Sequence, residues 1–144
     1  MSNNRKKPVV LVVDDEFSFH NNLVFSFGEY NLISVYKLDS AYPILEAVNL
    51  DLVILDVELD SNEVRRYRGV QLLEEIKAQR PELPVVIVTS HQGRKDFPQK
   101  LCFDKADKLL TKDEYNRNNW KQIFDDLMFD GESLKKKPIT DFAY

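Results

Sequence analysis

The segment Val9–Asp15 constrains the fold more than any other part of the sequence, because five apolar residues are followed at once by two acids. Four of the five are valines, and a short β-branched run is typical of a strand buried on both faces of a parallel sheet. Asp14 and Asp15 would then stand at the carboxyl end of the strand, where open α/β sheets bind ligands. Because adjacent carboxylates repel each other, they call for a cation, and oxygen-only ligands favour Mg²⁺. A plainer interpretation stays open, in which the strand enters a polar loop and Asp15 caps the next helix.

Composition places the chain in an ordinary class of protein. Its 144 residues suit one domain, and 43% hydrophobic with 31% charged residues is typical of a soluble globular protein. The net charge of −4 argues against a nucleic-acid partner, which requires a basic face. The single cysteine, Cys102, excludes an internal disulfide. No apolar run near the N-terminus is long enough for a signal peptide or a membrane span, so we expect a cytoplasmic protein with no membrane partner.

Strand-like and helix-like segments alternate along the whole chain. Strands are predicted at 9–13, 32–36, 50–55, 84–90 and 108–111. Apolar residues at helical spacing predict the intervening helices, and their inward positions are Phe19, Leu23 and Phe27, then Ile44, Leu45 and Val48, then Val70, Leu73 and Ile76, and last Trp120, Ile123, Phe124 and Leu127. The alternation predicts a doubly wound five-stranded parallel sheet, a flavodoxin-like (βα)5 three-layer sandwich.

The boundaries of these elements follow from capping and breaking residues. Asp39 or Ser40 is predicted to cap the second helix, and the last helix is predicted to begin at about Glu114. Only a short helix at about 98–103 is expected in the fourth helical position. The domain is expected to cover 8–130, with an arm at 1–7 and a tail at 131–144.

Most of the predicted strands end in a side chain that can bind a charged ligand: Asp14-Asp15, Asp56, Thr89-Ser90 and Lys112. The carboxyl ends of parallel strands gather at one crevice, where carboxylates, a hydroxyl and an ammonium could hold a divalent ion and a phosphate-like group. A carboxylate beside the metal can itself attack phosphorus and form an aspartyl phosphate. Each residue alone has an ordinary explanation, as a cap, a strand residue or a surface charge.

Taken in order, these four motifs resemble the receiver domain of two-component response regulators over roughly residues 8–128. The resemblance implies that Asp56 is the phosphoacceptor in a Mg²⁺-dependent reaction. It implies that Asp15 and Asp56 bind the metal, with Asp14 acting partly through water. The backbone carbonyl of Glu58, two residues past the acceptor, would be a further metal ligand.

The resemblance also assigns roles to the ends of the fourth and fifth strands. Thr89, with Ser90 beside it, would be the switch hydroxyl, and Lys112 would pair with the phosphoryl group. Glu58 and His91 flank the expected water path and could tune the lifetime of the phosphoryl group. The phosphoryl donor would be a histidine kinase or a histidine phosphotransfer protein. Output would come from changed protein contacts, including a homodimer through helix four, strand five and helix five, in a signalling domain that is not a turnover enzyme.

Four features depart from the family pattern. The loop from Asp56 to Gly69 is longer than usual, and Gly93 and Pro98 interrupt the fourth helical region. Asp113 follows Lys112 where the family usually has proline, so the cis peptide common there is not expected. Leu109 stands where an aromatic switch residue is common. The family's usual output mechanism therefore does not carry over directly.

Two other functions remain open on sequence grounds. One is a degenerate receiver that acts as a constitutive adaptor, which a Mg²⁺ titration without binding would favour. The other is a phosphatase of the haloacid dehalogenase type. Such an enzyme places a second Asp two residues after its nucleophile, where this chain has Glu58, and it carries a cap domain.

Overall fold

A single parallel sheet forms the centre of the computed structural model, which describes residues 7–56, 68–90 and 105–130. The strand order is β2-β1-β3-β4-β5, and every neighbouring pair is parallel. The strands are β1 (Val9–Val13), β2 (Asn31–Val35), β3 (Leu52–Leu55), β4 (Val85–Thr89) and β5 (Lys108–Thr111). The order reverses between β1 and β3, and a doubly wound sheet binds its ligands at the carboxyl side of such a reversal.

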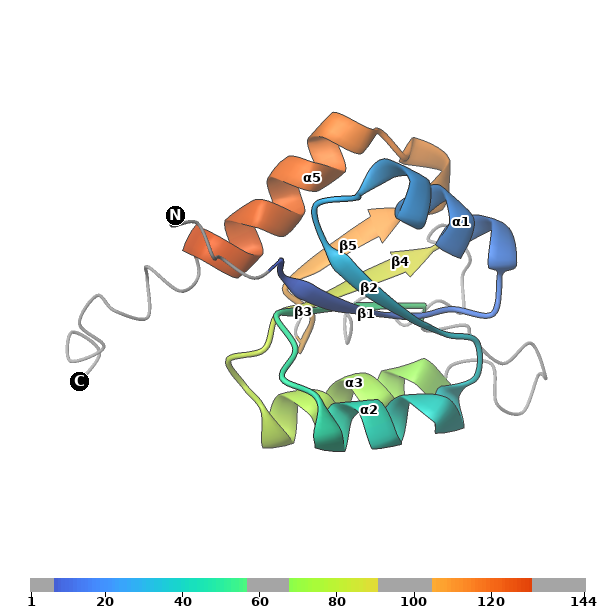
Figure 1. Ribbon diagram of the computed structural model, residues 1–144. Coiled ribbons are helices and arrows are strands. Elements are labelled where there is room, and N and C mark those ends of the chain that lie inside the picture. The colour runs from blue at the N-terminus through green and yellow to red at the C-terminus, as the bar shows by residue number, and fades with distance from the viewer. Residues whose placement is uncertain (1–6, 57–67, 91–104, 131–144) are drawn as a thin grey trace.

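Helices cover both faces of the sheet (Figure 1). One face carries α1 (Phe17–Ser26) and α5 (Arg117–Asp125), which runs on into a wider helical turn at Asp126–Asp130. The opposite face carries α2 (Ala41–Ala47), preceded by a tight turn at Leu38–Ser40, and α3 (Arg68–Gln79). The predicted five-stranded, doubly wound sandwich is therefore confirmed.

Two hydrophobic cores lie on either side of the sheet because side chains alternate along each strand. In β1, Leu11 and Val13 join the core under α2 and α3, while Val10 and Val12 join the core under α1 and α5. The strands β3 and β4 are buried at every position. Burial on both faces explains why these strands are continuous apolar runs in the sequence.

The predicted apolar faces of three helices are confirmed, while the inward residues predicted for α2 are only partly buried. Phe19, Leu23 and Phe27 are buried beneath α1, and Val70, Leu73 and Ile76 are buried beneath α3. Trp120 and Phe124 are buried beneath α5. Leu32 and Ile33 of β2 are only partly buried, as an edge strand allows.

One predicted cap and one predicted helix start are wrong. Ser40 occupies the position before α2, but its side chain makes no capping hydrogen bond, since the tight turn at Leu38–Ser40 already leads the chain into the helix. The last helix begins at Arg117 and not near Glu114, because residues 112–114 form a tight turn of their own. Asn116 then caps α5 through its side-chain oxygen, which accepts a hydrogen bond from the backbone N–H of Asn119 at 3.0 Å. The predicted helix at 98–103 lies outside the described residues.

Polar contacts tie α1 to α5. The Tyr30 hydroxyl, just beyond α1, donates to Asp125 at 2.6 Å, and burial raises the pKa of this phenol above its ordinary value. Arg117 donates to the backbone oxygen of Ser26 and pairs with Glu29 at 2.7 Å. No helix in the described part of the chain is long and apolar enough to cross a membrane.

The α1 face offers a direct test of the core. We expect Leu23→Ala to lower the free energy of unfolding by about 3 kcal/mol, because the Leu23 side chain is fully buried and its loss leaves a cavity. Val24→Ala is the matched control, since Val24 is 56% exposed and should cost little. Urea denaturation of both variants measures the difference, and equal losses would contradict this packing.

Candidate functional site

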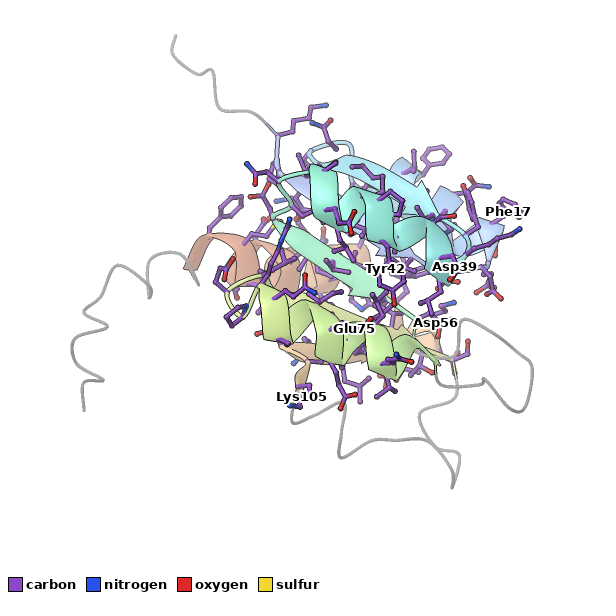
Figure 2. The ribbon with its side chains drawn as sticks, turned by 90° about the horizontal axis from the view of Figure 1, so that it is seen from below. Phe17, Asp39, Tyr42, Asp56, Glu75 and Lys105 are labelled. Carbon is purple, nitrogen blue, oxygen red and sulfur yellow. The ribbon has the colours of Figure 1, made fainter. Side chains whose placement is uncertain are left out.

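Strand register brings the predicted site residues to one edge of the sheet. Val13 of β1 pairs with Leu55 of β3, so Asp14 and Asp56 each follow at the same level of the sheet. The backbone N–H of Asp56 donates to the oxygen of Val13 at 3.0 Å, which fixes that level. Figure 2 shows Asp56 at the end of the molecule where Phe17 and Asp39 also lie.

The neighbouring strands complete this edge. Thr89 of β4 pairs with Thr111 of β5, and Lys112 follows directly. Thr89 is fully buried, and the adjacent Ser90 is exposed. The acidic residues of β1 and β3 therefore share an edge with the hydroxyl of Thr89 and the ammonium of Lys112, as the sequence predicted.

The Lys112 ammonium lies among three carboxylates. Its Nζ is 2.8 Å from Asp14 Oδ2, 2.7 Å from Glu16 Oε1 and 3.7 Å from Asp56 Oδ2. It also lies 4.7 Å from the centre of the Phe19 ring, close enough for a cation–π contact. Only 13% of the Lys112 side chain is exposed. Lys112 thus counters part of the repulsion among the acids.

Nearby charges and burial shift the pKa of the Lys112 ammonium in opposite directions. Burial acts to lower the pKa of Lys112, but its hydrogen bonds to Asp14 and Glu16, with the charges of Asp14 and Asp56, outweigh burial and raise that pKa above its ordinary value. The group therefore stays charged at neutral pH. The same contact with Lys112 lowers the pKa of Glu16.

The pKa of Asp15 is shifted in the opposite direction from that of Glu16. Partial burial and the neighbouring Asp14 charge raise the pKa of the Asp15 carboxyl above its ordinary value, although Lys112 partly offsets the shift. The carboxylate form of Asp15 is therefore held at some expense in free energy, which a bound cation would relieve.

Three of the four predicted metal ligands form a cluster in the described part of the chain. Asp14, Asp15 and Asp56 each offer a carboxylate oxygen, and these oxygens lie within 4.8 Å of one another. Asp14 and Asp56 are buried while Asp15 is exposed, so the cluster is open on one side. A set of carboxylate oxygens without nitrogen or sulfur fits a hard cation such as Mg²⁺.

The backbone of Asp14 is held by its neighbours. The backbone N–H of Asp14 donates to the backbone oxygen of Val35. The carbonyl oxygen of Asp14 lies 2.6 Å from His20 Nε2. Because a carbonyl only accepts, Nε2 carries the hydrogen. His20 is buried and its ring packs 4.4 Å from that of Tyr36, measured between centres. The acidic pair is therefore oriented by a buried histidine of α1.

The interpretation of Asp15 as a helix cap is wrong. The residue before α1 is Glu16, and its side chain makes no capping bond to the helix. Its backbone N–H instead donates to Asp14 Oδ1 at 2.8 Å. Glu58 and His91, the other predicted site residues, lie outside the described residues.

Sequence reasoning missed Glu16 and His20. Their spacing offers a signal, since positions 16, 20, 23 and 27 lie on one helical stripe that contains the buried Leu23 and Phe27. A polar residue on such a stripe, next to a predicted acidic site, faces the site or the core.

The family model of the response regulator receiver domain matches residues 10–124. No curated protein matches the sequence.

Several solved structures share the fold. A CheY-like response regulator receiver domain protein from Methanospirillum hungatei JF-1 is 18% identical with a TM-score of 0.75, over 89% of this chain and 98% of that one. The signal receiver domain of a putative Luxo repressor protein from Vibrio parahaemolyticus is 24% identical with a TM-score of 0.73, over 91% and 98%. NtrX from Brucella abortus, crystallised in complex with ADP, is 23% identical with a TM-score of 0.75, and the match covers 95% of this chain but 29% of NtrX.

Metal binding should show in stability. The pKa of Asp15 is raised in the folded protein. The contribution of Asp15 to the free energy of unfolding is therefore greatest below its ordinary pKa of 3.8, and it is lost as the pH rises through the folded-state pKa. At pH 7 with a chelator, we therefore expect Asp15→Asn to be more stable than wild type, by up to about 1 kcal/mol because the exposed side chain is screened by solvent. Added Mg²⁺ should stabilise wild type more than Asp15→Asn in thermal denaturation. An equal response to Mg²⁺ would contradict a role for Asp15 in the metal site.

The His20 hydrogen bond can be tested separately. We expect His20→Phe to lower the free energy of unfolding by about 1–3 kcal/mol, because it keeps an aromatic ring beside Tyr36 but leaves the Asp14 carbonyl without its donor. Urea denaturation measures the loss. A midpoint equal to that of wild type would show that the hydrogen bond adds nothing.

Proposed function

Since the chain belongs to the family of response regulator receiver domains, we propose that it accepts a phosphoryl group on Asp56 in a Mg²⁺-dependent reaction. The observation that carries the proposal is the meeting of Asp56 with two further acids and Lys112 at one edge of the sheet. Asp56 is 8% exposed, so its carboxylate is largely shielded from solvent.

Asp56 would act as the nucleophile, and Lys112 would stabilise the charge that is added. A carboxylate oxygen of Asp56 attacks the donor phosphorus, and the bond from phosphorus to the leaving group breaks with its electron pair going to that group. The leaving group is the imidazole of a phosphohistidine, which takes a proton from solvent, or acetate when acetyl phosphate is the donor. Lys112 would pair with the added negative charge, and its distance of 3.7 Å from Asp56 supports this role.

The acidic cluster accounts for the metal requirement. Asp15 and Asp56, the backbone carbonyl of Glu58 and, partly through water, Asp14 would hold the ion. Bound Mg²⁺ would offset the charge of the acids and of the phosphoryl oxygens as they approach. The chemistry of the donor set supports this assignment, because it contains only oxygen atoms.

The remaining assignments concern signalling. Thr89, with Ser90 beside it, would supply the hydroxyl that hydrogen-bonds the phosphoryl group, and Glu58 and His91 would set its lifetime. A histidine kinase or a phosphotransfer protein would be the donor. The receiver unit would cover 8–130, with 1–7 and 131–144 outside it, and signal through protein contacts such as a homodimer at the predicted fourth helix, β5 and α5. The clustered acids and Lys112 favour this function over a constitutive adaptor.

Intact-mass spectrometry tests the proposed reaction. We expect incubation with acetyl phosphate and Mg²⁺ to add one phosphoryl group, and a chelator to prevent it. Asp56→Asn should abolish the addition, because an amide is a far weaker nucleophile than a carboxylate. Asp126→Asn is the control, since Asp126 hydrogen-bonds Gln122 within the end of α5 and lies away from the site.

Two results would overturn the proposal. One is the absence of label in wild type with either acetyl phosphate or a phosphorylated histidine kinase. The other is undiminished label in Asp56→Asn. Steady release of inorganic phosphate from a phosphomonoester would instead indicate a phosphatase.

A further inference from the structure

Both oxygens of the Glu16 carboxylate have partners in the protein. Oε1 lies 2.7 Å from the Lys112 ammonium, and Oε2 accepts a hydrogen bond from the Ser18 hydroxyl at 3.3 Å. Its backbone N–H donates to Asp14 Oδ1 at 2.8 Å. The carboxylate is thus fixed beside Lys112, although the two residues are 96 positions apart in the sequence.

Lys112 makes its two short carboxylate contacts with Glu16 and Asp14 and lies farther from Asp56. The ammonium is 2.7 and 2.8 Å from Glu16 and Asp14 but 3.7 Å from Asp56, which is beyond ordinary hydrogen-bond distance. The centre of the Phe19 ring lies 4.7 Å from the same ammonium. Lys112 is therefore drawn toward the first turn of α1 and away from the proposed phosphoacceptor.

The two close partners of Lys112 differ in exposure. The Asp14 side chain is 1% exposed, whereas the Glu16 side chain is 50% exposed. An exposed carboxylate loses an ion pair at little cost, because water replaces its partner. Glu16 is thus the partner that Lys112 can most readily give up.

An incoming phosphoryl group would compete for the same ammonium. If Lys112 turns from Glu16 to an anion on Asp56, the Glu16 contact is lost, so this contact would favour the unphosphorylated protein. Among the described residues, Glu16 and Asp15 are exposed acids next to this site in the sequence. Glu16 therefore disfavours the reaction twice, through its hold on Lys112 and through its own negative charge.

We propose that Glu16 is a positioning residue that holds Lys112 away from Asp56 in the unphosphorylated protein and slows phosphoryl transfer. This inference rests on the proposed phosphoacceptor function. It predicts an exchange in which Lys112 leaves Glu16 for the phosphoryl group, while its contact with the buried Asp14 carboxylate anchors it at the edge of the sheet.

The direct test compares rates of phosphorylation by acetyl phosphate at saturating Mg²⁺. We expect Glu16→Gln to react about two- to fivefold faster than wild type, the factor that corresponds to loss of a half-exposed ion pair. Glu29→Gln is the matched control, because Glu29 also forms a 2.7 Å ion pair, with Arg117, and its side chain is 43% exposed. Glu29→Gln should react at the wild-type rate.

The outcomes separate this inference from the function on which it rests. Absence of label in wild type and Glu16→Gln overturns both. Label in both at equal rates, or slower labelling of Glu16→Gln, overturns this inference alone. Slower labelling would indicate that Glu16 assists metal or donor binding.

A second measurement needs neither metal nor donor. In a double-mutant cycle of Glu16→Gln and Lys112→Met, measured by urea denaturation with a chelator, we expect the two changes to be coupled by about two- to fivefold in the unfolding equilibrium constant. Additive effects would show that the two side chains do not interact in solution, and would overturn the inference.

Discussion

Repulsion among carboxylates at one edge of the sheet is the constraint on which the structure depends. Asp14, Asp15 and Asp56 offer oxygens within 4.8 Å of one another, and two of the three residues are buried. Charges so close and so poorly hydrated are stable only with a cation beside them. Lys112 supplies one positive charge within the protein, while burial and the neighbouring Asp14 charge raise the pKa of Asp15.

Residues at the start of α1 contact Lys112 and Asp14 and help to hold them in place. Phe19 lies against the Lys112 ammonium, His20 holds the carbonyl of Asp14, and Glu16 gives Lys112 a further partner. Contacts from Tyr30 to Asp125 and from Arg117 to Glu29 tie the far end of α1 to α5. The helix that supports the site is therefore anchored away from the site, so local changes at the edge of the sheet need not disturb the core.

Much of this arrangement could be predicted from the sequence, because strands buried on both faces are apolar runs and the residues that follow them are conspicuous. Asp14, Asp56, Thr89 and Lys112 were identified in this way, and strand register brings them to a common edge. The roles of Glu16 and His20 depend on side-chain direction and on contacts with distant residues, which local patterns do not encode. The start of α5 differs from the prediction for a local reason, since a tight turn at 112–114 and the Asn116 cap place it later in the chain.

The central claim is that Asp56 gains an anionic group while Lys112 changes partners. The most direct measurement is a crystal structure of the protein with Mg²⁺ and beryllium trifluoride, which mimics a phosphoryl group. We expect the beryllium on a carboxylate oxygen of Asp56, with the ion bound to Asp15 and Lys112 Nζ turned from Glu16 to a fluorine atom. A mimic bound to another carboxylate, or a Lys112 that still pairs with Glu16, would contradict this account.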